Sequence, residues 1–156
     1  MVSMSVLSLI LVLFPAFALA QQSPSLASLK DKNRVLLVSA QTDQDPGFQQ
    51  QIAILNHHAQ EMKDRDLVLL PVLIHIGGAA SADTLRTIHP PVASDAEQID
   101  LRRHFHIETA QFTVILIGKD GGEKLRQHTP ITIQKLNATI DAMPMRRDEM
   151  RSRNPQ

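Results

Sequence analysis

Apolar residues along this chain follow two patterns: short continuous runs, and positions that recur every three or four residues. Continuous runs at 34–40 (RVLLVSA), 67–76 (LVLLPVLIHI) and 112–118 (FTVILIG) are typical of strands buried on both faces. A tight Lys-Asp-Gly-Gly turn joins the last run to the polar segment 123–127, which predicts a hairpin with 123–127 at the sheet edge. Pro71 inside the second run predicts a bulge or a gap in the strand ladder.

Recurring apolar positions predict three helices among these strands. The first begins at Asp45-Pro46, because aspartate accepts hydrogen bonds from a first helical turn and proline fits the first helical position. Its apolar stripe runs over 48–62. A Ser-x-x-Glu capping box opens the second helix, over 94–104. Thr129-Pro130 is predicted to cap the third helix, which Pro144 disrupts or ends.

The predicted order of elements is therefore β-α-β-α-β-β-α. Two strands joined by a crossover helix lie parallel, whereas the hairpin makes the last two strands antiparallel. The expected fold class is α/β: a thioredoxin-like three-layer fold with a mixed four-stranded sheet. We expect this domain to span 34–150, preceded by a flexible lead-in at 21–33 and followed by a disordered tail at 151–156.

The first twenty residues are typical of a secretory signal peptide. They carry no charged side chain, contain an apolar run at 6–14, and end in the small-x-small sequence Ala18-Leu19-Ala20. A membrane anchor is the alternative, but this run is shorter than the ~20 apolar residues that a spanning helix needs. Cleavage between Ala20 and Gln21 would give a periplasmic or secreted protein with no membrane attachment.

Composition narrows the range of activities. Sixteen basic and sixteen acidic side chains leave a formal net charge of zero, which gives no general attraction to nucleic acid or to anionic membranes. No cysteine is present, so the chain cannot supply the thiolate that thiol-disulfide exchange and thiol peroxidases require. No sequence motif indicates a bound cofactor, a metal site or a catalytic residue.

The predicted topology sorts the polar residues into two groups at opposite ends of the sheet. In thioredoxin-like enzymes the reactive thiol lies at one end, where the N-terminus of the first helix favours an anion, and we call this end the thiol pole. In one interpretation, Asp45 serves only as the helix cap. In the other, His75 and His128 form a two-histidine, one-carboxylate metal site with Asp43 or Asp45. The thiol pole is predicted to contain Thr42, Asp43, Gln44, Asp45, His75, Gln111 and His128.

The opposite end is predicted to collect charges of both signs, and we call it the charged pole. These charges could form an ion-pair network that pins the segment after Pro144 against the domain. Alternatively they form a docking surface for an anionic group or a partner protein, with Arg146 and Arg147 as bidentate donors. The charged pole is predicted to contain Arg34, Asp64, Arg65, Asp66, Lys119, Asp120, Asp141, Arg146, Arg147 and Glu149.

Two stretches carry a family resemblance, 114–126 (VILIGKDGGEKLR) and 140–150 (IDAMPMRRDEM). Together with the RVLLVSA strand and Asp45-Pro46, they resemble the domain-of-unknown-function 4174 family, which has exported bacterial members and is similar to domains of animal sushi-repeat extracellular proteins. The resemblance implies a peroxiredoxin-like variant of the thioredoxin fold. A peroxiredoxin's Thr-x-x-Cys would correspond to Thr42–Asp45, so Asp45 stands where the peroxidatic cysteine would be.

We therefore expect an exported, cysteine-free thioredoxin-like domain that acts as a non-catalytic binding module for a periplasmic protein partner. The predicted interaction surface comprises Lys119, Asp120, Asp141, Arg146, Arg147 and Glu149. The alternative is a cysteine-free enzyme, with or without a metal ion, or a degenerate peroxiredoxin-like protein. Its candidate residues lie at the vacant thiol pole: Thr42, Asp43, Asp45, His75 and His128.

Overall fold

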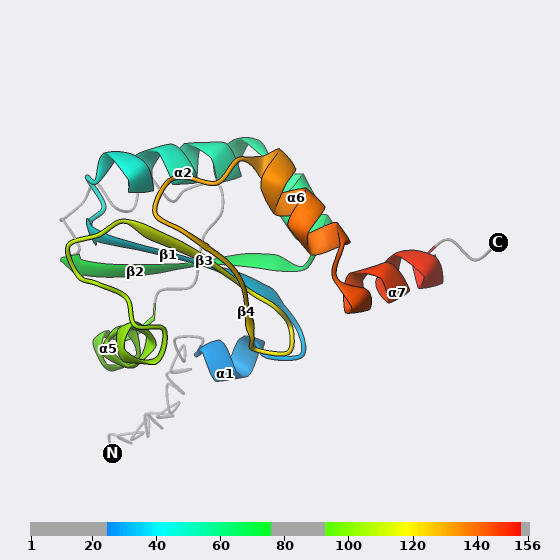
Figure 1. Cartoon of the computed structure of the whole chain (residues 1–156), viewed down its shortest axis with the longest axis horizontal. Helices are drawn as coiled ribbons and strands as arrows, with labels where there is room; N and C mark the ends of the chain where they lie inside the picture. The colour runs from blue at the N-terminus through cyan, green and yellow to red at the C-terminus, as the bar shows by residue number, and fades with distance from the viewer. Residues whose placement is uncertain (1–24, 76–92, 154–156) are drawn as a thin grey trace, which may run out of the picture.

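A mixed four-stranded sheet organises the molecule, as the computed structural model of residues 25–75 and 93–153 shows (Figure 1). The strand order is β2-β1-β3-β4. β1 pairs in parallel with β2, and β3 pairs antiparallel with both β1 and β4. The predicted mixed sheet and hairpin are confirmed. The strands are β1 (Arg34–Thr42), β2 (Leu67–His75), β3 (Thr113–Ile117) and β4 (Glu123–Gln127).

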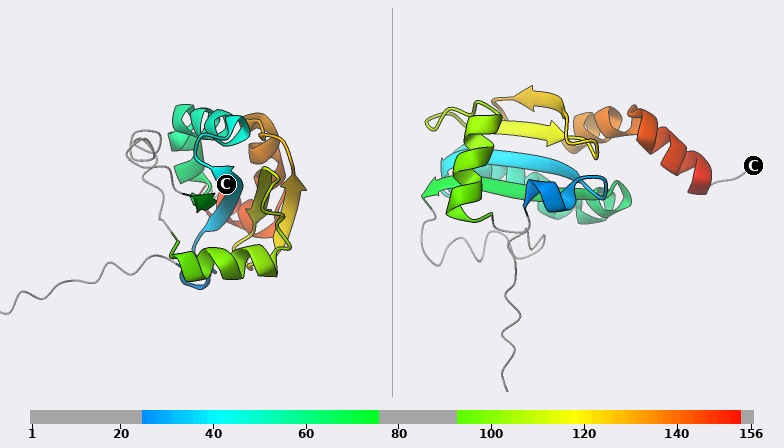
Figure 2. Two further views of the ribbon diagram at one scale, coloured as in Figure 1. Left: turned by 90° about the vertical axis from the view of Figure 1, so that its left-hand side faces the viewer. Right: turned by 90° about the horizontal axis from the view of Figure 1, so that it is seen from below.

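Helices cover both faces of this sheet and complete three layers (Figures 1 and 2). One apolar cluster joins Leu36 and Leu116 of the sheet to Leu55 and Leu136 of the helices above it. A second cluster lies beneath the other face, which α5 and α1 cover. Within the described residues, no helix is long and apolar enough to cross a membrane. The upper layer holds α2 (Pro46–His57), α3 (Ala59–Asp64) and α6 (Ile133–Asp141), and the lower layer holds α1 (Leu26–Leu29) and α5 (Asp95–His104).

Alternation along β1 explains its continuous apolar sequence. Val35 and Leu37 belong to the lower cluster, whereas Leu36 and Val38 belong to the upper one. Because β1 is an interior strand covered on both faces, each of these side chains is at most 1% exposed. β1 therefore contributes side chains to both apolar clusters and lies at the centre of the fold.

Pro71 lies in β2 without the predicted bulge. The register between β1 and β2 continues unshifted on both sides of it, with Leu37 opposite Leu70 and Ser39 opposite Val72. β2 is an edge strand, and an edge tolerates a residue that lacks a backbone donor. The expected irregularity was wrong because the sequence alone did not show which strand would lie at the edge.

Two helix boundaries also differ from the predictions. The helix predicted over 46–62 is divided at His58 into α2 and α3. Thr132, rather than Thr129-Pro130, caps α6 by accepting a hydrogen bond from the backbone amide of Lys135. The preceding Ile131 is fully buried, and the Gln51 side chain bonds both its N–H (2.7 Å) and its C=O (3.3 Å). These long-range bonds engage the backbone of Ile131 and help to hold it outside the helix.

The chain ends of the domain extend beyond the predicted limits. α1 falls within the segment expected to be a flexible lead-in, and its Leu26 amide donates to Glu97 of α5 at 2.6 Å. α6 ends at Asp141, just before Pro144, so the predicted interruption is confirmed. Pro144 then starts a further helix, α7 (Pro144–Arg153), which runs past the expected boundary at residue 150. The predicted signal peptide, residue 76 and the last three residues lie outside the described residues.

Candidate functional site

At the thiol pole, the start of α2 carries a carboxylate with internal partners. Asp45 is the N-cap of α2, and its Oδ1 accepts hydrogen bonds from the backbone amides of Gly47 (2.8 Å) and Phe48 (3.1 Å). These are amides that an anionic ligand or thiolate would otherwise meet at the helix N-terminus. The capping interpretation of Asp45 is thereby confirmed.

The neighbouring residues of the thiol pole are held by local contacts. Asp43 is 1% exposed, and its backbone carbonyl accepts a hydrogen bond from the Gln49 side chain. Thr42 accepts a hydrogen bond from the Gln44 amide (3.3 Å), and the same Thr42 lies opposite His75 in the β1–β2 register. The ends of β1 and β2 therefore meet at this pole as predicted.

Two residues that the sequence analysis did not assign to the thiol pole lie there. Phe112 packs over the start of α2, because a Cβ added to Gly47 would lie 2.9 Å from its Cγ. The buried Thr113 places its hydroxyl 3.1 Å from Nδ1 of the exposed His128. Both residues directly follow Gln111, which was assigned to this pole, and this position in the sequence could have identified them.

No metal-binding arrangement is present among the described side chains. Within that part of the chain, no group of three or more His, Asp or Glu residues could hold a metal ion. The side chain of His75 lies outside it. The two-histidine, one-carboxylate site therefore stays a prediction.

At the charged pole, a guanidinium is buried at the start of β1. Arg34 is 1% exposed and pairs with Glu149 of α7 through two hydrogen bonds, of 3.2 Å from Nη1 and 3.1 Å from Nη2. Its Nη1 also donates to the backbone carbonyl of Arg65 at 2.9 Å. This bidentate geometry joins the first strand of the domain to its last helix.

Glu149 is the carboxylate on which several cations converge. Lys119, from the turn between β3 and β4, donates to Glu149 at 2.8 Å and to Asp66 at 2.9 Å. Burial alone would raise the pKa of Glu149, but the hydrogen bonds from Lys119 and Arg34 outweigh it and lower this pKa to about 2. The same carboxylates raise the pKa of Lys119 in spite of its burial. Both groups are therefore charged throughout the neutral pH range.

A second carboxylate, Asp141, joins α6 to two arginines. Arg65 donates to it through Nε (3.1 Å) and Nη2 (2.6 Å), and Arg146 donates through Nε at 3.2 Å. Burial opposes ionisation of Asp141, yet these two arginines hold its pKa below the usual value. Arg146 also donates to the backbone carbonyl of Asp64 at 2.9 Å. The network therefore anchors α7 to both α3 and α6.

Adjacent arginines of α7 have opposite environments. Arg146 is 6% exposed and is committed to internal partners. Arg147 is exposed, and its side chain makes no hydrogen bond or ion pair with any other described residue. The hypothesis that both arginines act together as external donors is therefore wrong for Arg146, because its guanidinium already has partners.

The structure assembles most of the predicted charged pole and adds two members. Asp120 does not join the Glu149 cluster and pairs instead with Lys124 across the turn, at 2.6 Å. Arg153 reaches the backbone carbonyl of Asp64 at 3.1 Å. Sequence analysis missed Lys124 and Arg153; the position of Lys124 just across the predicted hairpin turn was the signal for it.

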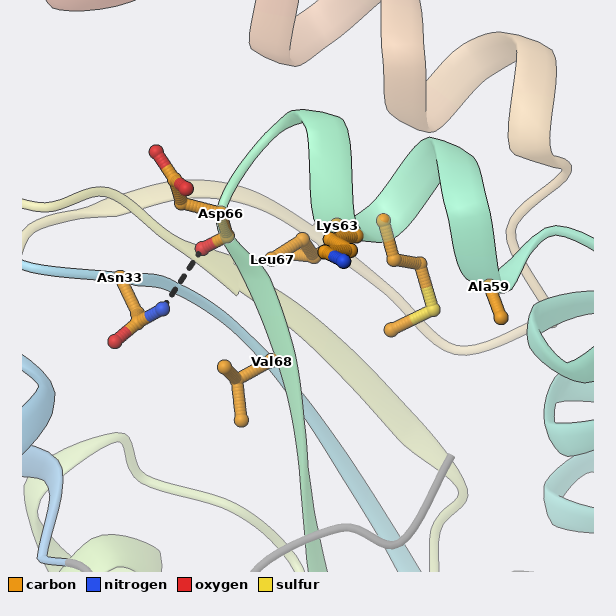
Figure 3. Close-up of a pocket in the computed structure, with 7 residues that line it drawn as sticks. Asn33, Ala59, Lys63, Asp66, Leu67 and Val68 are labelled. Carbon is orange, nitrogen blue, oxygen red and sulfur yellow. Dashed lines mark hydrogen bonds between the residues drawn. The ribbon is translucent and has the colours of Figure 1, made fainter. Parts of the chain in front are cut away.

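Several cavities border the charged pole, and two of them adjoin the sheet. One, of about 350 Å³, lies beside α3 and the start of β2, where the Asn33 side chain donates to the carbonyl of Asp66 at 3.4 Å (Figure 3). The other, of about 330 Å³, lies between the β3–β4 turn and the joint of α6 with α7, and we call it the turn pocket. The turn pocket is lined by Arg34, Gly118, Lys119, Asp120, Lys124, Met143, Pro144 and Met145.

Solved structures similar to this chain confirm the thioredoxin-like fold. AhpC of Mycobacterium tuberculosis is 18% identical with a TM-score of 0.59, covering 79% of this chain and 74% of that one. The reduced 2-Cys peroxiredoxin of Plasmodium vivax is 14% identical with a TM-score of 0.57, covering 80% and 83%. StoA from Bacillus subtilis is 16% identical with a TM-score of 0.52, covering 69% and 81%. At these identities the likeness concerns the fold alone.

One similar protein with a curated description is coiled-coil domain-containing protein 80 of Danio rerio. It is 28% identical over an alignment of 136 residues, and the match covers 80% of this chain and 15% of that protein. The chain thus spans a small part of this relative's length. A family model described as a domain of unknown function (DUF4174) matches residues 25–149, including the β3–β4 turn and the start of α7. The chain therefore belongs to the DUF4174 family.

Proposed function

We propose that this domain is a non-catalytic interaction module, exported to the periplasm, that binds a protein partner through the charged pole. The observation that carries this proposal is the contrast between Arg146 and Arg147. The first anchors α7 by buried ion pairs, and the second is presented outward with no internal partner among the described residues. An exposed guanidinium on an anchored helix loses less freedom on binding than one on a loose tail.

The thiol pole supports the same proposal by its chemistry. Thiol-based catalysis is excluded because the chain contains no cysteine. The α2 N-terminus is also less suited to an external anion, since Asp45 already accepts its amide hydrogen bonds. Binding is therefore better placed at the opposite end of the sheet.

Cross-linked capture from periplasmic extract tests the proposal. The bait is the chain from residue 21 onward, compared with its Arg147→Glu variant. We expect a protein that wild type enriches and Arg147→Glu loses. Arg103→Glu is the matched control, because Arg103 is an exposed helical arginine on α5, away from the charged pole. Equal enrichment by all three baits would contradict the proposal, as would no enrichment at all.

Export is tested separately. Residues 1–33 are fused to a reporter enzyme that is active only outside the cytoplasm, and Leu9→Arg interrupts the apolar run as a control. We expect reporter activity from the wild-type fusion and its loss in the control. Mass spectrometry of the purified protein should show an N-terminus at Gln21, and an intact Met1 would contradict cleavage.

A further inference from the structure

The turn pocket combines an apolar lining with cationic side chains. Met143, Pro144 and Met145 form a consecutive apolar stretch at the joint between α6 and α7. Met145 is 48% exposed, and among the described residues only Ile99 (52%) is a comparably exposed large apolar side chain. Methionine adapts its shape readily, so Met145 is suited to covering an inserted side chain.

Both walls of the turn pocket are held in place. On the turn side, Lys124 pairs with Asp120 at 2.6 Å, and a Cβ added to Gly118 would lie 2.5 Å from the Lys124 side chain. On the helix side, Arg34 pairs with Glu149 and fixes α7 one turn beyond Met145. A cavity already formed in this way costs less ordering free energy when it is filled.

The guanidinium of Arg147 is an exposed positive charge next to the turn pocket. Glu149 accepts from Lys119 and from two arginines, and Asp141 accepts from two arginines, so these carboxylates are already engaged. Arg147 follows Pro144 by three residues and so shares its face of α7. Its side chain has no partner among the described residues. The complementary ligand is therefore acidic beside its apolar part.

We infer that the turn pocket binds a peptide segment of a partner, taking one aliphatic side chain between the turn and Met145, with a flanking carboxylate near Arg147. A volume of about 330 Å³ suits one or two side chains rather than a large ligand. This inference rests on the proposed function and names the chemistry of the segment recognised. It combines an apolar anchor with acidic-motif recognition by cations.

Selection from a random dodecapeptide phage library on the chain from residue 21 onward tests the inference. We expect enriched peptides with a Leu, Ile or Met next to Asp or Glu. A synthetic peptide of the enriched sequence is then titrated by fluorescence anisotropy. Met145→Glu and Arg147→Glu should each weaken binding by about tenfold or more, as loss of a central contact does. Ile99→Glu and Arg103→Glu are the matched controls and should leave the Kd unchanged.

Several outcomes would overturn the inference: no enriched sequence, an enriched sequence without an acidic residue, or equal binding by Met145→Glu and wild type. The two proposals can fail separately. A captured native partner that depends on Arg147 but not on Met145 would leave the interaction module standing and refute the pocket. If peptides bind in a way that requires Met145 but no native partner is captured, the pocket stands and the interaction module is refuted.

Discussion

The two poles lie at opposite ends of β1 and are built from contacts of different range. At the thiol pole, Asp45 bonds to amides two and three residues away. At the charged pole, Arg34 and Glu149 are 115 residues apart, and Arg65 and Asp141 are 76 apart. The Asp45 contacts depend only on the start of a helix. The ion pairs of the charged pole form only when the three layers and α7 are assembled. The charged pole should therefore respond far more strongly to mutation.

The largest effect is expected from Glu149→Gln. This change removes the anion between Arg34 and Lys119 and leaves a guanidinium that is 1% exposed without its carboxylate. Breaking a buried pair in this way costs about 3–5 kcal/mol of unfolding free energy. Urea denaturation measures it. Asp148→Asn is the control, because its carboxylate is exposed on the same helix. A comparable loss there would mean that the effect does not come from the buried Arg34–Glu149 pair.

Acid should weaken the charged pole through the same carboxylate. The pKa of Glu149 is about 2 in the folded protein, below its usual value of 4.5. A group with a depressed folded-state pKa stabilises above its unfolded pKa and loses that contribution as pH falls through the folded one. Stability should thus decline between about pH 4.5 and 2, with a shallower decline in Glu149→Gln. Parallel pH curves for the two proteins would contradict this role for Glu149.

Separate replacement of Arg146 and Arg147 tests the difference between adjacent positions. Arg146→Ala removes hydrogen bonds to Asp141 and to the Asp64 carbonyl, and should lower the free energy of unfolding by about 1–3 kcal/mol. Arg147→Ala should change it by less than about 0.5 kcal/mol. Chemical denaturation of the two variants gives the comparison. Equal losses would mean that Arg147 also anchors α7.

The smallest effect is expected at the thiol pole. Asp45→Ala removes the side-chain acceptor for two amides of α2 and should cost about 1 kcal/mol. Asp45→Asn keeps an acceptor and should retain most of that stability. Thermal unfolding followed by circular dichroism distinguishes them. A loss from Asp45→Ala as large as that from Glu149→Gln would show that Asp45 does more than cap a helix.

Where sequence reasoning succeeded, the relevant contacts were local or periodic. The continuous apolar run of β1 and the apolar stripe of α2 follow from the side-chain periodicity of a strand buried on both faces and of a helix. The Asp45 cap depends on residues two and three positions away, so it could be predicted from the local sequence. The cap of α6 was misplaced because Gln51 bonds Ile131 from 80 residues away. Capping preferences carry no information about such a partner.

By itself, the amino-acid sequence determined the order of the four strands with α2, α5 and α6 among them, the absence of thiol chemistry and the nature of the Asp45 cap. These follow from residue identity and short spacings. Only the tertiary structure decided that Arg146 is committed inside while Arg147 faces outward, and that a pocket opens beside Met145. The physical reason is that ion pairs between distant segments depend on how the layers pack, and packing assigned neighbouring arginines of one helix to different environments.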